Sequence, residues 1–458
     1  MTSISGAVTA TEVPGVSADG GVGGGVGGAS LAIRSQAGAR AFLLRDPARP
    51  LVATSLRFAV GSARDPAGLS GLAHVLEHMM FCGTRRFGRG GHLQMIQSIG
   101  GFANATTSAD WTRHFNVVPA DLITILLDLE AERLVQAPEA MTEAALDIER
   151  DVVLSERRER VESAPYGAAT AELLAALYPA DSPNRWLPVG SAEDVGRMQL
   201  GDCLRFHADH YVAPNVNLSL VGDFDPWVLA EPVTALLDTL GAGSPGSGQA
   251  GQAGGAGQAG QGSCEGVGAV RDLLVTRRIE IASALPPKLF IGCLLPVSTS
   301  WDFELARFAG LCLGRGVSAR LSERLIRSER VATAVQVKTM ARAGYASAGI
   351  IEITPVDGMS ASQVIDRLDA ALADSVDGGL TEADLIRTKA MYRSSWLADD
   401  DTFIGRSDSL SLAMQLNGSA DAYFGHDARI SQINLDQLRS AVLGWHQPDH
   451  RVELVYSP

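Results

Sequence analysis

Hydrophobic residues alternate with polar ones in short stretches near the start of the chain. Apolar runs at Leu31–Ile33, Ala41–Leu44 and Leu56–Val60 have the two-residue period of strands that bury one face. After them, hydrophobic positions recur at helical spacing from Ser70, a candidate N-cap, to about Cys82. The pattern therefore predicts a block of strands followed by a helix.

The next part of the chain changes from helical to alternating and back again. A short helix is predicted over residues 92–99, and a hairpin follows it with strands at 102–107 and 111–118. Long helical patterns then run over residues 119–135 and 142–161. Because strands and helices come in separate blocks, the pattern favours α+β layers over a regular βαβ winding.

Two distant segments of the chain end in the same way. Residues 206–215 include histidines and a proline and lead into an alternating apolar run at 216–221. Residues 445–450 have the same character and lead into a similar run at 452–456. A helix leading into a terminal strand, found twice, predicts duplication of one α/β unit.

A tract rich in Gly, Ala, Gln and Ser separates these two halves. It covers residues 241–268, has no apolar periodicity and is expected to be a flexible linker. The linker divides the chain into two predicted domains of ordinary size, 29–240 and 269–458. Residues 1–28 are rich in Gly and lack the pattern of a secretory signal, so we expect a disordered tail there.

Charge and composition narrow the classes of partner. The 458 residues include 38 Lys+Arg and 52 Asp+Glu, and the net charge of −14 has the wrong sign for binding nucleic acid. A basic peptide suits it better. No apolar stretch is long enough to span a membrane. The five cysteines are odd in number and form no CxxC pair, which favours a reducing compartment, and we expect a cytoplasmic protein.

Candidate chemistry lies on the helix predicted from Ser70. His74 and His78 are four residues apart, so both imidazoles can reach one metal ion, and Glu77 shares their face and can touch a water. A third ligand is expected from another element, and Glu149 and Glu156 lie two turns apart on a later predicted helix. One of them could bind the metal while the other supports the site. The alternative is a pair of packed or surface histidines.

Three segments carry a family resemblance. Residues 71–84, GLAHVLEHMMFCGT, resemble the inverted zinc motif of the M16 metallopeptidases, the family of pitrilysin, insulin-degrading enzyme and mitochondrial processing peptidase. Residues 100–108, GGFANATTS, and 149–156, ERDVVLSE, are similar to that family's GG-x-x-NA-x-T-S and ER-x-VV-x-x-E segments. The resemblance implies one Zn²⁺ per chain, with Glu156 as third ligand after His74 and His78.

The resemblance also implies a fold and a way of binding substrate. It implies the short, M16B-like class, with two homologous α/β sandwich-like domains, mostly antiparallel sheets and the LuxS/MPP-like metallohydrolase fold. The second domain lacks the metal motif, and the resemblance implies that two chains, or four domains, close like a clamshell around a peptide. In the family, the segment containing Phe102, Asn104 and Ala105 pairs with the substrate as an added strand. The alternative for Asn104 is an amide that caps a turn.

The residue types predict peptide hydrolysis. A metal held by His74, His78 and Glu156 would lower the pKa of a water, and Glu77 would act as general base. Glu149 is a second catalytic candidate that supports the site, although it could also be an ordinary solvated charge.

The second half departs from the family pattern at one position. Residues 313–321 resemble the family's GGG-x-SSRL segment, and Arg327 matches the arginine of a later motif that helps to hold the substrate. Seven residues further on, the family has a tyrosine and this chain has Ala334. Losing one oxyanion donor can cost about a hundred-fold in rate. We therefore expect a partner chain that supplies the Arg/Tyr pair in a heterodimer, with a homodimer or compensation by Tyr345 as alternatives.

Two other classes of function stay open. One is a catalytically silent M16-like subunit that is structural or binds peptides, and the other is a structural zinc site, which usually has a fourth Cys or His. The remaining histidines considered have no acidic or cysteine partner at metal-site spacing and are expected to be packing or surface residues: His114, His207, His210, His446 and His450.

Overall fold

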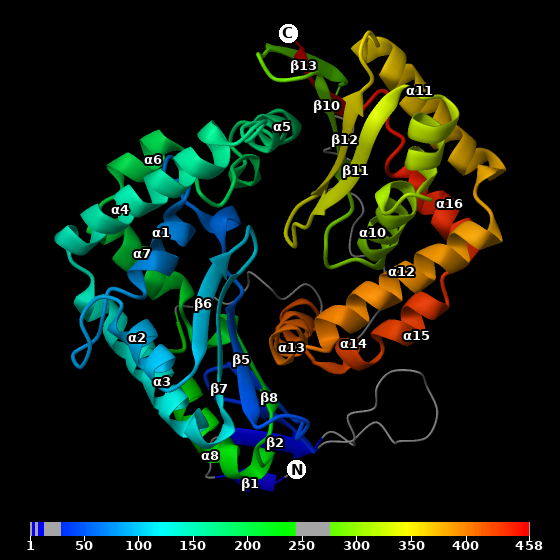
Figure 1. Cartoon of the computed structure of the whole chain (residues 1–458). Helices are drawn as coiled ribbons and strands as arrows, with labels where there is room; N and C mark the ends of the chain where they lie inside the picture. The colour runs from blue at the N-terminus through cyan, green and yellow to red at the C-terminus, as the bar shows by residue number, and fades with distance from the viewer. Residues whose placement is uncertain (1, 5–7, 13–28, 244–274, 458) are drawn as a thin grey trace. The chain divides into compact units, whose positions relative to one another are not determined.

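The computed structural model describes residues 2–4, 8–12, 29–243 and 275–457, which form two compact units (Figure 1). Unit 1 contains residues 1–158, 188–256 and 398–425, and unit 2 contains residues 159–187, 257–397 and 426–458. Most of the predicted linker lies outside the described residues. No helix in the described ranges has both the length and the apolar character needed to cross a membrane.

Unit 1 is built on a sheet with the strand order β1-β2-β3-β4-β8-β5-β7-β6. Among the described strands of this sheet, only the β4/β8 pair is parallel. The strands are β1 (Thr2–Ile4), β2 (Val8–Glu12), β3 (Ser30–Arg34), β4 (Arg40–Arg45), β5 (Leu51–Phe58), β6 (Phe102–Thr107), β7 (Thr112–Pro119) and β8 (Val216–Gly222). The hairpin predicted at residues 102–118 is present as β6 and β7.

Strands β1 and β2 fall within the predicted disordered tail. Residues 9–12 pair with residues 31–34 in antiparallel register and extend the sheet beyond β3. The segment of β2, VTATE, contains β-branched residues that fit a strand, and backbone pairing with β3 does not need the long apolar run that the prediction looked for. The rest of that tail lies outside the described residues.

Helices cover both faces of the unit 1 sheet. They are α1 (Leu72–Met79), α2 (Gly91–Ser98), α3 (Ile123–Ala140), α4 (Glu143–Arg157), α6 (Ala192–Arg197), α7 (Leu200–His210), α8 (Pro226–Asp238), α13 (Phe403–Asn417) and α14 (Asp421–Phe424). On β5, the ring of Phe58 stacks on Tyr211, just after α7. Ser55, three residues earlier on the same strand, contacts Ser411 of α13. Successive strand side chains point to opposite faces, so α13 lies on the face away from α7.

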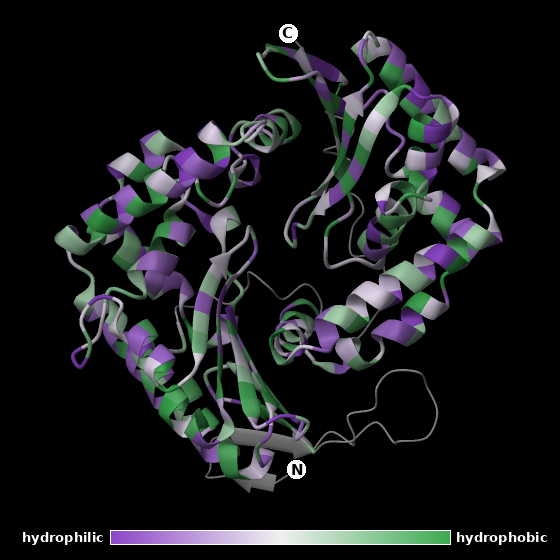
Figure 2. Cartoon of the chain, in the orientation of Figure 1, coloured by the Kyte–Doolittle hydropathy of each residue, from purple (hydrophilic) through white to green (hydrophobic). Residues whose placement is uncertain are grey.

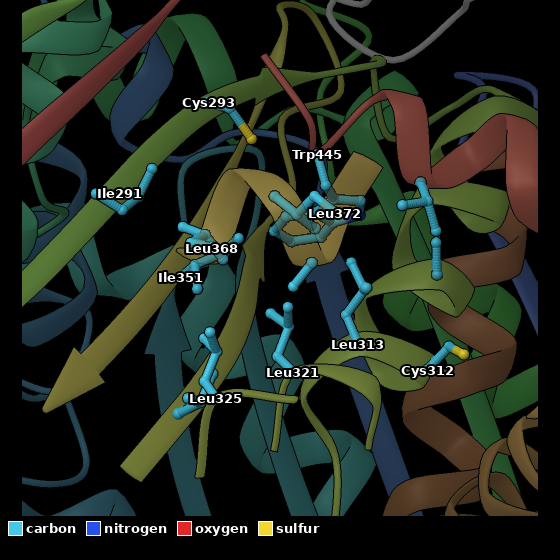
Figure 3. Packing of buried hydrophobic residues seen from close by; sticks show 14 of the residues in the cluster. Ile291, Cys293, Cys312, Leu313, Leu321, Leu325, Ile351, Leu368, Leu372 and Trp445 are labelled. Carbon is cyan, nitrogen blue, oxygen red and sulfur yellow. The ribbon is translucent and has the colours of Figure 1, made fainter. Parts of the chain in front are cut away.

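Unit 2 contains a five-stranded sheet with the order β11-β12-β10-β13-β9. Its strands are β9 (Arg277–Ala282), β10 (Lys288–Leu295), β11 (Ala332–Met340), β12 (Ser347–Pro355) and β13 (Arg451–Ser457), and its helices are α5 (Ala169–Leu177), α10 (Trp301–Gly314), α11 (Ala361–Asp374), α12 (Glu382–Asp400, to residue 397), α15 (His426–Ser431) and α16 (Leu435–Leu443). Ile291, Leu313, Leu368 and Trp445 belong to the core between this sheet and its helices (Figure 3). In Figure 2 the helices carry both hydrophilic and hydrophobic residues, as expected of helices that bury one face.

The two sheets share one topology. Strands β4 to β8 form the order β6-β7-β5-β8-β4, and β9 to β13 form β11-β12-β10-β13-β9. Each strand of the unit 2 sheet therefore has a counterpart among β4 to β8, in the same chain order. The first and last strands of each set pair in parallel, β4 with β8 and β9 with β13, and the other pairs are antiparallel. The predicted duplication and the α+β class with mostly antiparallel sheets are confirmed.

The compact units differ from the two continuous stretches 29–240 and 269–458. Residues 159–187, with α5, pack in unit 2, and residues 398–425, with α13, pack in unit 1. Polar groups hold α13 on the sheet. Arg57 of β5 is fully buried and pairs with Asp408, and Ser55 Oγ lies 2.9 Å from Ser411 Oγ. The chain therefore crosses between units at these two segments as well as at the linker.

Candidate metal centre

Helix α1 presents two histidines and a glutamate from a firmly packed backbone. The apolar side of the helix, formed by Val75, Leu76 and Met79, is completely buried. The helix begins one residue later than predicted, because Gly71 is the N-cap and has the positive φ of +97°. The Ser70 hydroxyl donates a hydrogen bond to Asp194 instead of capping the helix. The helix start is thus fixed by tertiary contacts.

Asp65 takes the place of the predicted cap. Its carboxylate oxygens accept hydrogen bonds from the backbone N–H groups of Gly71, at 2.7 Å, and Ala73, at 2.9 Å. These are donors at the first turn of α1 that the helix itself leaves unpaired. Burial raises the pKa of Asp65 to about 8, although the hydrogen bonds from these backbone N–H groups lower it. Asp65 therefore holds the turn from which His74 projects.

His74 and His78 of α1 and Glu156 of α4 converge. Each offers one ligand atom, and the three atoms lie within 4.8 Å of one another. His74 Nε2 is 3.7 Å from one oxygen of Glu156, and His78 Nε2 is 3.9 Å from the other. Ligands around a tetrahedral zinc ion are about 3.4 Å apart, so the two imidazoles and the carboxylate lie close enough together to share one ion. Two imidazoles and one carboxylate are also the donor set of a catalytic zinc with an open position.

Glu149 of α4 lies behind His78. Its Oε2 atom is 3.3 Å from His78 Nδ1, the ring nitrogen that does not face Glu156. Burial raises the pKa of Glu149, but hydrogen bonds from His78 and Arg89 outweigh this and leave it below its usual value. Burial lowers the pKa of His78, but the hydrogen bond to Glu149 and the carboxylates nearby raise it overall. Glu149 is thus an ionised partner of His78 and not a solvated charge, since its side chain is only 8% exposed.

Glu77 is on α1, between the candidate ligands His74 and His78, and its side chain is buried. Its Oε2 atom accepts a hydrogen bond of 2.5 Å from the hydroxyl of Thr107, the last residue of β6. The Thr107 hydroxyl also lies 3.4 Å from that of Thr112, across the hairpin. Sequence reasoning gave Thr107 no role, although it stands within the segment 100–108 that carried the family resemblance.

Three of the four predicted substrate-binding residues, Phe102, Asn104 and Ala105, lie on an edge strand. Among the described strands, β6 pairs only with β7 and ends the sheet. Phe102 is 50% exposed, and Asn104 is also exposed. Asn104 lies within β6 and not in the turn, and its side-chain oxygen accepts a hydrogen bond from the backbone N–H of Ala105. The alternative of a turn-capping amide is therefore wrong.

Arg327, Ala334 and Tyr345 belong to unit 2. Arg327 lies on a π-helix at Ser322–Ser328, is half-exposed and forms an ion pair with Glu323 at 3.3 Å. Ala334 is exposed on β11. Burial raises the pKa of Tyr345, and its ring packs on the ring of Tyr178. Arg327 and Ala334 thus lie on two elements that contact each other, and one of them, β11, is an edge strand of the second sheet.

The other histidines do not extend the centre. His114 is buried and its Nδ1 lies 3.0 Å from Arg133, which also pairs with Glu130. His207 packs on the ring of Tyr211, and burial lowers the pKa of His207 to about 4. Among the described residues, His74, His78 and Glu156 form the one group of three or more possible ligands close enough to share an ion. For His114 and His207, this agrees with the prediction that they are packing or surface residues.

Two family models match the chain. Residues 40–185 match the model described as insulinase, peptidase family M16, and residues 197–392 match the model described as the peptidase M16 inactive domain. The first match contains α1, β6 and α4, and the second contains α10, β11 and Arg327. The candidate ligands His74, His78 and Glu156 all lie within the first match and in unit 1.

Known proteins are similar over different shares of the chain. The zinc protease PqqE of Helicobacter pylori is 31% identical over 173 residues, which are 38% of this chain and 38% of that protein. The coenzyme PQQ synthesis protein F of Klebsiella pneumoniae is 34% identical over 40% of this chain and 24% of its own length. The chain therefore matches well under two thirds of either relative. An uncharacterized zinc protease of Streptomyces coelicolor is 25% identical over 83% of this chain and 79% of its own length.

Solved structures share the fold. The crystal structure of a protease from Helicobacter pylori superimposes with a TM-score of 0.79 and 19% sequence identity, over 94% of this chain and all of that chain. The crystal structure of a peptidase M16 inactive domain from Pseudomonas fluorescens gives a TM-score of 0.77 with 18% identity, over 94% and 98% of the two chains.

Proposed function

We propose, on the premise that the chain belongs to peptidase family M16, that it is a zinc-dependent endopeptidase acting on extended peptides or small unfolded polypeptides. The convergence of His74, His78 and Glu156 carries this proposal, since two imidazoles and a carboxylate within 4.8 Å, next to the buried Glu77, are what metal-assisted hydrolysis requires. The names of the relatives as zinc proteases support it.

Each residue has a distinct task in this mechanism. His74, His78 and Glu156 would hold one zinc ion, which supplies Lewis acidity and brings the pKa of a water towards neutrality. Glu77 takes the proton of the attacking water and returns it to the leaving amine. Thr107 fixes the Glu77 carboxylate by its hydrogen bond. Glu149 orients the imidazole of His78 through Nδ1.

The substrate would bind along β6. An extended peptide that adds to this edge strand is held by backbone hydrogen bonds, which demand little of its sequence. Phe102, Asn104 and Ala105 lie on that strand, and Phe102 offers an exposed aromatic ring to an apolar side chain. The net charge of −14 favours basic peptides.

A second M16-like chain would complete the enzyme. Arg327 is present, but Ala334 has no hydroxyl with which to stabilise an oxyanion. A heterodimer whose partner supplies the Arg/Tyr pair accounts for both residues, and a homodimer is the alternative. We further propose that the protein acts in the cytoplasm, because the four described cysteines are buried free thiols, which suits a reducing compartment.

The test is hydrolysis of a quenched fluorescent peptide library by the chain alone and with an M16-like chain that carries the Arg/Tyr motif. Glu77→Gln should abolish cleavage and leave bound zinc unchanged, because the amide cannot accept the proton. Glu193→Gln, at an 84% exposed side chain, is the matched control and should cleave normally. Cleavage that survives Glu77→Gln would refute the mechanism.

A catalytically silent subunit that binds peptides is the second candidate, and Ala334 is the observation that favours it. Such a subunit would bind zinc and peptide but would cleave nothing, either alone or with the partner chain. A general base hydrogen-bonded beside three ligands argues for the enzyme, since peptide binding alone does not need one.

A further inference from the structure

The loop between α1 and α2 is fastened by arginines. Gly83 lies in its first half with a φ of +128°, where a Cβ atom would come within 2.7 Å of the backbone oxygen of Phe87. The loop closes on itself through Thr84 N–H to Phe87 O, at 2.7 Å, and Gly90 N–H to Phe81 O, at 3.0 Å. Three arginines on it each pair with a glutamate of α3 or α4: Arg85 with Glu139, Arg86 with Glu132 and Arg89 with Glu149.

Only the third pair leads to a candidate metal ligand. Arg89 donates from Nε, at 2.9 Å, and from Nη2, at 2.6 Å, to the same Oε1 atom of Glu149. The other oxygen of Glu149, Oε2, is the one that lies 3.3 Å from His78 Nδ1. The two oxygens of this buried carboxylate are therefore divided between the arginine and the histidine.

We propose that Arg89 is a positioning residue that fixes the Glu149 carboxylate against His78 and thereby tightens zinc binding. The inference rests on the proposed zinc site. A carboxylate can rotate about its last bond, and a planar guanidinium that donates twice to one oxygen opposes that rotation. The second oxygen then stays in place to accept the His78 Nδ1 hydrogen, which keeps Nε2 free to bind the metal.

The expected loss follows from what such outer partners contribute. Removing a partner of a ligating histidine typically weakens metal binding about 10- to 100-fold. We expect Glu149→Ala to fall in that range and Arg89→Ala to weaken zinc about 10-fold, because Glu149 remains but is no longer fixed. Arg89→Lys keeps the charge but cannot donate in the same planar geometry, so it should rescue only part of the loss.

A double substitution shows whether Arg89 acts through Glu149. If it does, Arg89→Ala added to Glu149→Ala should cost nothing further, whereas two independent effects would multiply. Arg86→Ala is the matched control, since it removes a neighbouring ion pair of the same loop that does not reach His78.

The experiment titrates metal-free protein with zinc against a chromogenic chelator and measures thermal unfolding of the same metal-free samples. We expect weaker zinc binding in Arg89→Ala alone, with unfolding close to that of Arg86→Ala. Equal or tighter zinc binding by Arg89→Ala overturns the inference, as does an equal loss in Arg86→Ala, which would mean that the loop pairs act only by anchoring. Failure of the unchanged chain to bind zinc would instead overturn the proposed site.

Discussion

The hydrogen bond from Thr107 to Glu77 allows base chemistry to be separated from metal binding. Thr107→Val keeps the size and shape of the side chain and removes the hydroxyl that donates at 2.5 Å to Glu77 Oε2. Glu77 is only 8% exposed, so little solvent can replace the lost donor. The substitution should leave the general base in place but poorly oriented.

The size of the effect follows from the charge on the acceptor. A hydrogen bond to a charged group contributes about 1.5 to 3 kcal/mol, and each 1.36 kcal/mol of barrier is a factor of ten in rate. If the bond is kept in the transition state, its loss should lower kcat/KM by about one to two orders of magnitude. Zinc affinity should not change, because Thr107 contacts none of His74, His78 or Glu156 in the interactions described.

The assay measures kcat/KM for a cleaved peptide and the zinc dissociation constant of the same samples. Thr107→Ser keeps the hydroxyl and should retain most of the activity, which separates the hydrogen bond from packing at the end of β6. Unchanged kcat/KM in Thr107→Val would refute the reasoning. A loss of zinc that accounts for the lost activity would also contradict it, because Thr107 would then act on the metal site and not on the base.

Two further outcomes follow from the structure. Burial raises the pKa of Glu130, but Arg133 and His92 hold it well below its usual range, so this carboxylate stabilises the fold above its unfolded pKa of about 4.3 and less as pH falls below it. Glu130→Gln should lower the free energy of unfolding by about 3 to 5 kcal/mol, because it leaves Arg133 buried without its charge partner. In urea unfolding at a series of pH values, the variant should lose less stability than the unchanged chain as the pH falls below about 4.3. Ala334→Tyr, at an exposed strand position, should barely change thermal stability and should raise cleavage by the chain alone up to about a hundred-fold; no gain would mean that the missing hydroxyl is not what limits it.

What the sequence could predict depends on how far apart the interacting residues are. His74 and His78 follow from helical spacing alone, since one turn brings them to one face. Glu156 needed the family resemblance, because its approach to α1 results from the packing of α4. Arg89 could not be singled out, since three arginines of one loop look alike until the packing shows which glutamate each one meets.

The exchange of segments between units was hidden for a similar reason. Asp408 and Ser411 give α13 a polar face, which in a sequence is typical of a helix exposed to solvent. In the structure that face meets Ser55 and Arg57, polar residues on the buried side of β5. Periodicity identifies which residues share a face but not what the face packs against, and here polar packs on polar.

Duplication shows how one position in the fold can serve two purposes. Helix α10 lies between β10 and β11, as α1 lies between β5 and β6. In α10, residues such as Phe308 and Leu313 are completely buried in the core of unit 2. In α1, the equivalent helix of unit 1, His74 and Glu77 are buried polar side chains, and apolar side chains in their place would contribute more stability. Unit 1 must offset that cost by fixing the helix from outside, through the Asp65 cap and the packed residues around it, and we infer that substitutions there would reduce zinc binding and stability together.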